Sequence, residues 1–277
     1  MSNRAVISLL ALATFLFSIA TLSLATEAVE LTRHLVPSIY VFGDSIVDVG
    51  NNNFLPPPAA RAKSPYGIDS PASITGRFTN GYNIADLVAR RLGSQEQVTV
   101  GWPVLHALYK MGARRLGILD VPAIGCTPGA RVPMMNGVCN DAANSMAQIF
   151  NKLLRVEVAR AVKTSMPGMK YSIGSTYNVL IDLINKPFVA GLREVERACC
   201  GSGTLNAEAM CSMPNTTYCM DRDEYMFWDK LHPTQAMYER GVMAIFYGSK
   251  KYADPINFAG LIPSMNDTMT PPDVYSI

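Results

Sequence analysis

The spacing of apolar residues along the chain predicts alternating helices and strands. In NIADLVARRLG the apolar positions fall on one helical face and Gly93 follows them, so a helix is expected there. The β-branched and aromatic run SIYVF, within residues 35–42, is typical of a buried strand, and so is the apolar run RLGILDVP.

Similar patterns predict the remaining elements. Residues 141–165 form the longest expected helix, with Asn140 or Asp141 as its N-cap and Pro167 beyond its end. Loops are expected over 51–79, which is rich in Pro, Gly and Ser, and over 198–220, which is rich in cysteine. Further helices are expected in PVLHALYKMGA, YNVLIDLIN and TQAMYERGVMAIFYGS, and a further strand in MKYSIG. This alternation predicts an α/β protein with a parallel sheet, in a single domain over residues 26–277.

The composition is that of a globular protein. The 277 residues are 49% hydrophobic and 17% charged, which does not suggest extended disorder. The net charge is only +2 and no basic run is present, so we expect no nucleic-acid partner.

The first 25 residues resemble a secretory signal peptide. Arg4 is the only charged residue before Glu27, and between them lies a long apolar stretch that ends in small residues. Cleavage is expected after Ala25 or Ala28. The alternative is a membrane anchor, because the uncharged stretch is long enough to span a bilayer. With cleavage, we expect a secreted, extracellular protein of the apoplast or cell wall, without stable membrane insertion.

The cysteines and two sequons agree with an oxidising compartment. An even number of cysteines in a secreted chain favours disulfides. Their spacing suggests a local bridge between the first two and two bridges among the last four, in which the adjacent pair has different partners. A zinc site is the alternative interpretation, although no Cys-x-x-Cys pair is present. Glycosylation is expected at Asn215 and Asn266. The cysteines are Cys126, Cys139, Cys199, Cys200, Cys211 and Cys219.

The tripeptide Gly43-Asp44-Ser45 directly after SIYVF is the first candidate for chemistry. A serine at the carboxyl end of a strand can be a nucleophile, but Gly, Asp and Ser are also ordinary turn residues. Asp44 and Asp48 are expected to cap the turn through their own backbone.

The second candidate is FWDKLHPTQ, in which Asp229 and His232 are three residues apart. In a turn or at a helix start, this spacing directs both side chains the same way. The carboxylate can then orient the imidazole, which activates a serine hydroxyl. The alternative is an ordinary Asp–His pair on the surface. His34 and His106 lie in no such context, and Phe227 and Trp228 are expected to pack in the core.

Together these segments resemble the plant GDSL esterase/lipase family of the SGNH hydrolases. The resemblance implies a three-layer α/β/α fold with a five-stranded parallel sheet. It also implies Ser45 as nucleophile, His232 as general base, Asp229 as its orienting partner and the Ser45 backbone N–H as an oxyanion donor. The matching segments are FGDSIVDVGNNN, GRFTNGYNIADLVARRLG, LYKMGARRLGILDVPAIGCTPGARV, CNDAANSMAQIFNKLL, ACCGSG and FWDKLHPTQAMYERGV.

The chain departs from the family pattern near residues 93–102. Two family segments are expected between RLG and MGARR, and they supply a glycine and an asparagine as further oxyanion donors. Neither is found, and Gly101 lies in no matching context. About a hundred family positions, including two strands, are missing, as in a splice form or a truncated gene model. SIYVF and LGILDV are then expected to pair directly or to leave a hole.

The resulting expectation is a secreted serine ester hydrolase. Its substrates would be small-molecule or lipid esters with acyl or acetyl groups, and we expect neither a metal nor another cofactor. The alternative is a catalytically impaired or inactive secreted glycoprotein that keeps the family scaffold.

Overall fold

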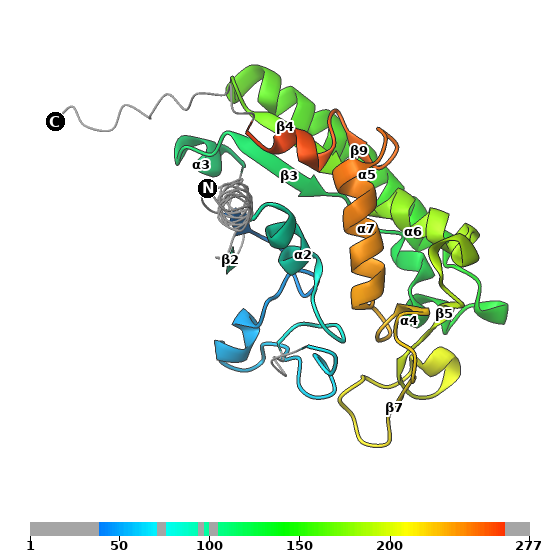
Figure 1. Cartoon of the computed structure of the whole chain (residues 1–277). Coiled ribbons are helices and arrows are strands. Elements are labelled where there is room, and N and C mark those ends of the chain that lie inside the picture. The colour runs from blue at the N-terminus through cyan, green and yellow to red at the C-terminus, as the bar shows by residue number, and fades with distance from the viewer. Residues whose placement is uncertain (1–38, 71–75, 94–96, 100–104, 264–277) are drawn as a thin grey trace, which may run out of the picture.

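The computed structural model describes residues 39–70, 76–93, 97–99 and 105–263 (Figure 1). The expected signal peptide, His34, Gly101 and Asn266 lie outside these residues. Strand β1 (Ile39–Val41) leads through the Ser45 turn, the 3-10 turn η1 (Asn51–Phe54) and a long loop to helix α2 (Ile84–Arg91). The chain then returns as β2 (Gln97–Thr99), which pairs in parallel with β1. This first part is therefore a βαβ unit.

A three-stranded sheet forms the centre of the remaining chain. Strand β3 (Arg115–Leu119) pairs in parallel with β4 (Lys170–Gly174), and β9 (Ala253–Asp254) pairs antiparallel on the other side of β4. The long helix α5 (Asp141–Ser165) connects β3 to β4 and runs alongside them in Figure 1. A Cβ at Gly174 would lie only 2.8 Å from Ile245 of α7 (Gln235–Tyr247), so α7 packs directly on β4. Helices and paired parallel strands confirm the α/β class.

Most expected helices occur at their expected positions. Helix α5 has the expected bounds, with Asn140 as its N-cap. Helix α2 begins with a capping box, in which the Asn83 side chain accepts from the N–H groups of Ala85 and Asp86 while Asp86 accepts from the Asn83 N–H. The other helices are α3 (Leu105–Lys110), α4 (Pro128–Arg131) and α6 (Thr176–Asn185), and the remaining 3-10 turns are η2 (Ile124–Cys126), η3 (Met135–Gly137), η4 (Pro187–Ala190), η5 (Thr204–Asn206) and η6 (Phe258–Leu261).

The strands differ from the expectations in two ways. Of the two alternatives for SIYVF and LGILDV, direct pairing does not occur: β1 pairs with β2, a three-residue segment too short to predict, and β3 lies in a separate sheet. The sequence predicts that β1 and β3 are buried, but no residue of either strand is fully buried, and Tyr40 of β1 is 63% exposed. The reason is their position, since neither has a described strand on its second edge. The last three residues of β4 are buried because strands flank it on both sides.

The cysteine-rich region forms a small subdomain of short strands. Strand β5 (Glu194–Ala198) pairs in parallel with β8 (Tyr225–Phe227), and β6 (Cys200–Gly201) pairs antiparallel with β7 (Thr217–Tyr218). Disulfides join Cys126 to Cys139, Cys199 to Cys219 and Cys200 to Cys211. These bridges confirm the local pair and the different partners of the adjacent cysteines, and they exclude those cysteines as zinc ligands.

Two apolar clusters surround the segment that carries Asp229 and His232. The larger one joins α2, α6 and α7 to β8 and includes the buried Phe227 and Phe246. The smaller one contains Tyr66, Phe78 and Trp228, packed with the two bridges of the cysteine-rich loop. Within the described part of the chain, no helix is long and apolar enough to cross a membrane.

Candidate active site

Ser45 lies in a turn directly after β1. The Asp44 carboxylate accepts from the Ile46 N–H at 3.0 Å, and the Val47 N–H donates to the Asp44 carbonyl at 3.1 Å. The Asp48 carboxylate accepts from the backbone N–H groups of Gly50 and Asn51. Both aspartates therefore cap the turn, as their position in the sequence predicts. Ser45 itself is partly exposed.

Asp229 and His232 lie in a tight loop between β8 and α7. The N–H of Trp228 donates to the carbonyl of His232 at 2.8 Å, which closes the loop. One carboxylate oxygen of Asp229 then accepts from the backbone N–H groups of Leu231 and His232, each at 2.7 Å. The chain therefore bends back at this point, which brings the two side chains together. The other carboxylate oxygen lies 2.8 Å from Nδ1 of His232.

The three residues expected from the sequence meet although they are far apart in the chain. Nε2 of His232 lies 2.8 Å from Oγ of Ser45, across 187 positions of sequence. A proton on Nδ1 is held by Asp229, and this leaves Nε2 to accept the serine proton. The arrangement is therefore a hydroxyl, an imidazole and a carboxylate in series, the geometry used for nucleophilic catalysis by serine.

Two of these three residues, Asp229 and His232, are buried. Asp229 is 1% exposed and His232 is 6% exposed. Burial disfavours the Asp229 carboxylate, but the hydrogen bond and charge of His232 and two backbone N–H groups outweigh burial and hold the pKa of Asp229 below its ordinary value. Asp229 is therefore ionised near neutral pH and can stabilise a protonated His232.

Two aromatic residues of the 51–79 loop complete the site. Phe78 stacks on the imidazole of His232, with ring centroids 5.1 Å apart. The hydroxyl of Tyr66 donates to Asp229 at 2.7 Å. The sequence analysis did not identify either residue, because a polar loop gives no periodic signal. The only available hint is that both aromatic residues lie in a segment otherwise rich in Pro, Gly and Ser.

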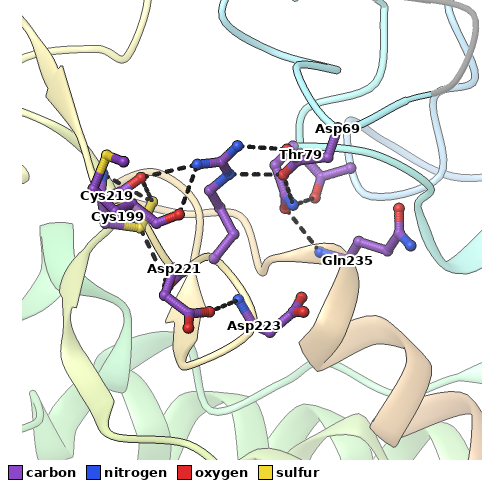
Figure 2. A network of polar contacts seen from close by, with 10 residues as sticks. Asp69, Thr79, Cys199, Cys219, Asp221, Asp223 and Gln235 are labelled. Atoms are coloured by element: carbon purple, nitrogen blue, oxygen red, sulfur yellow. Dashed lines mark hydrogen bonds and ion pairs between the residues drawn. A yellow bond between two sulfur atoms is a disulfide. The ribbon is translucent and has the colours of Figure 1, made fainter.

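A polar network lies beside the loop of Asp229 and His232 (Figure 2). Two nitrogens of the Arg222 guanidinium donate to the carboxylate of Asp69, both within 2.8 Å. The third nitrogen of Arg222 donates to the carbonyls of Cys219 and Met220. The hydrogen bond from Arg222 holds the pKa of Asp69 below its usual value. The same guanidinium therefore joins the cysteine-rich loop to the 51–79 loop.

The network continues to the start of α7. Asn80 donates to Asp69 at 2.8 Å and accepts from the N–H of Gln235 at 2.9 Å. Thr79 donates to the carbonyl of Pro233, next to His232, at 2.9 Å. Three segments distant in sequence therefore converge around the loop of Asp229 and His232.

The remaining residues singled out in the sequence lie elsewhere. His106 is exposed on α3 and contacts Ser165 at 2.6 Å, without a carboxylate partner among the described residues. Phe227 and Trp228 are fully buried, as expected. Asn215 is exposed and adopts a left-handed conformation, with φ of 64°. No group of three or more possible metal ligands occurs in the described ranges.

The backbone N–H of Ser45 makes no hydrogen bond to another described residue. Backbone N–H groups beside a reacting carbonyl are donors of the kind that stabilise an oxyanion.

Comparisons with known proteins identify the family. Residues 94–245 match the family model described as GDSL-like lipase/acylhydrolase, a range that includes Asp229 and His232 and begins after Ser45. Two GDSL esterase/lipases of Arabidopsis thaliana are each 26% identical, over 86% of this chain and over 95% and 92% of their own lengths. The anther-specific proline-rich protein APG of Brassica napus is 24% identical over 74% of this chain and 70% of its own length.

The first of these alignments is longer than the chain itself. It extends over 352 residues, whereas the chain has 277, so at least 75 aligned positions of the relative have no counterpart here. The family model covers more than half of the chain, and the similar plant proteins carry the same family name. The chain therefore belongs to the GDSL-like lipase/acylhydrolase family, whose members are hydrolases of esters.

Proposed function

We propose that this protein is a secreted serine ester hydrolase that cleaves acyl or acetyl esters, lipid esters included. The observation that carries the proposal is the 2.8 Å contact between Oγ of Ser45 and Nε2 of His232, with Asp229 on the opposite ring nitrogen. Family membership supports hydrolysis of esters, and the geometry supports these three residues as the groups that perform it.

The reaction follows from the positions of these groups. His232 takes the hydroxyl proton of Ser45 while Oγ attacks the carbonyl carbon of the ester, and the carbonyl oxygen becomes negatively charged. The backbone N–H of Ser45 donates to that oxygen. The bond to the alcohol then breaks, and the alcohol leaves with the proton from His232. Water, deprotonated by the same imidazole, releases the acid and restores Ser45.

Three features support secretion. All six cysteines form disulfides, which persist in oxidising compartments. Asn215 of the sequon NTT is exposed, so it is accessible for glycosylation. The apolar segment of residues 1–25 resembles a signal peptide.

A second candidate function is a secreted glycoprotein with little or no catalytic activity. The unmatched positions of the Arabidopsis relative support it, because the family's glycine and asparagine donors have no matching segment here.

Replacement of Ser45 distinguishes the two candidates. With 4-nitrophenyl acetate as substrate, Ser45→Ala should reduce hydrolysis to the rate without enzyme, because the reacting oxygen is removed. Ser165→Ala is the matched control, since Ser165 also contacts a histidine, His106, but in a pair without a carboxylate among the described residues. Its rate should equal that of the unchanged protein. Hydrolysis that persists in Ser45→Ala would refute the site, and no hydrolysis by the unchanged protein would favour the inactive glycoprotein.

A further inference from the structure

Tyr66 occupies an enclosed position beside the proposed catalytic carboxylate. Its side chain is 2% exposed, and its ring makes edge contacts with Phe78 and Trp228 at centroid distances of 5.7 and 6.3 Å. These rings fix the direction of its hydroxyl, which donates to Oδ2 of Asp229 at 2.7 Å. A loop residue 163 positions away therefore makes a direct contact with the carboxylate.

The hydroxyl and the imidazole contact the same carboxylate oxygen. Oδ1 of Asp229 accepts from the two backbone N–H groups of its own loop, whereas Oδ2 is the oxygen nearest Nδ1 of His232, at 2.8 Å. Tyr66 donates to this same Oδ2. A second donor on one oxygen limits rotation of the carboxylate and withdraws negative charge from the side that faces the imidazole.

We propose that Tyr66 is a positioning residue for ester hydrolysis: its hydroxyl holds the Asp229 carboxylate toward His232 and weakens the attraction of that carboxylate for a protonated imidazole. The inference rests on the proposed function, because it concerns the same three residues. Tyr66 contacts neither Ser45 nor His232 through a hydrogen bond in the described part of the chain, so its effect passes through Asp229.

The electrostatic surroundings support this role. Burial raises the pKa of Tyr66, and the charge of Asp229 raises it further, so the hydroxyl is a neutral donor near neutral pH. Burial also raises the pKa of Tyr238, with Asp229 and Asp44 as further causes. Among the described residues, Tyr66, Tyr238 and His232 are therefore the titratable groups that interact with Asp229.

Tyr66→Phe removes the hydroxyl and keeps the ring. The carboxylate then carries more charge toward the imidazole, so protonated His232 is favoured and the acid limb of the pH–rate profile moves to higher pH. Without this hydrogen bond the carboxylate can rotate away from the imidazole, so we expect kcat to fall about 10-fold and the limb to move by up to about 1 pH unit. KM should change little, because the hydroxyl is directed at Asp229 rather than at the substrate.

Tyr252→Phe is the matched control. The Tyr252 hydroxyl also donates to a carboxylate, Oδ2 of Asp182, at 2.7 Å, but this pair lies outside the site. Its removal should leave kcat and the pH profile unchanged. Both variants are compared below their unfolding temperatures, and the rates are expressed per site that reacts with a fluorophosphonate probe, so that unfolded protein does not contribute.

NMR titration of the His232 ring separates the inference from the proposed function. The His232 signals are those lost in His232→Ala, and in Tyr66→Phe they should titrate at higher pH than in the unchanged protein, whether or not the protein hydrolyses esters. Identical His232 titrations in the two proteins would overturn the role of Tyr66. A shifted titration together with no Ser45-dependent hydrolysis would support the action of Tyr66 on Asp229 and His232 and refute the proposed function alone.

Discussion

The two sides of the candidate site differ in how firmly the fold holds them. Asp229 and His232 lie in a loop beside the disulfide-linked subdomain. Hydrogen bonds hold the backbone of the loop and the Asp229 carboxylate, and its aromatic neighbours pack in the smaller apolar cluster. Ser45 lies in a partly exposed turn after β1, a strand whose described pairing is with a three-residue partner. We call the first region the base side and the second the nucleophile side.

The less firmly held side is also the one near which the chain departs from its relatives. The base side falls within the range matched by the family model, and the polar network of Figure 2 joins the segments beside it. On the nucleophile side, β1 pairs with β2, which lies in the part of the sequence where the family's further oxyanion donors are expected and not found. Under the proposed function, His232 is therefore well oriented, while stabilisation of the oxyanion depends on the backbone N–H of Ser45.

The largest expected effect follows from the nucleophile side. Loss of one oxyanion donor typically lowers kcat by about 10²–10³. With two donors absent, this chain should hydrolyse 4-nitrophenyl acetate at least about 10³ times more slowly than the Arabidopsis relative that aligns over 95% of its length. The measurement is kcat/KM for both proteins, expressed per site that reacts with a fluorophosphonate probe. Equal values would show that another group supplies the missing donors.

A smaller effect is expected on the base side from the disulfide between Cys199 and Cys219. This bridge closes a loop over 20 positions and packs against the cluster of Trp228 and Tyr66. Loops of this size gain about 3 kcal/mol from closure, so the double variant Cys199→Ala with Cys219→Ala should lose about that much free energy of unfolding. Urea unfolding followed by tryptophan fluorescence measures the loss.

The bridge between Cys126 and Cys139 supplies the comparison for that variant. It closes 13 positions, outside the cluster of Tyr66, Phe78 and Trp228. Its removal should cost a similar free energy of unfolding and leave the titration of His232 unchanged, whereas removal of the Cys199 bridge should also alter that titration. Indistinguishable His232 titrations in the two variants would show that the base side does not depend on the cysteine-rich loop.

The sequence predicted local features well and long-range features poorly. Helix α5 has the predicted bounds because Asn140 and Pro167 are local signals. Strand β2 was missed because three residues carry no periodicity, and the partner of β1 was not predicted because pairing depends on a segment far along the chain. The meeting of Ser45 with His232 was expected from a family resemblance, whereas the contact between Tyr66 and Asp229 has no counterpart in any local pattern.

The smallest expected effects compare a helix cap on the nucleophile side with a cap that belongs to neither side. Asn83 caps α2 on the nucleophile side, and its side-chain amide also donates to the carbonyl of Asp48 in the Ser45 turn at 2.9 Å. Asn140 caps α5, and its side chain accepts from the N–H of Ala143 at 3.0 Å. Replacement of a capping asparagine by alanine typically costs about 1 kcal/mol, so both variants should fold.

The two cap variants should differ in where the protein opens. Asn83→Ala removes a helix cap and the link to the Ser45 turn together, so amide hydrogen exchange should quicken in peptides over 44–50 and 84–92 and stay unchanged over 225–247. Asn140→Ala should quicken exchange at the start of α5 and leave 44–50 unchanged. Because Asn83 supports the turn of the nucleophile, Asn83→Ala should also lower kcat several-fold, whereas Asn140→Ala should not. Faster exchange over 225–247 in Asn83→Ala would show that the two sides open as one unit, and the contrast between them would then fail.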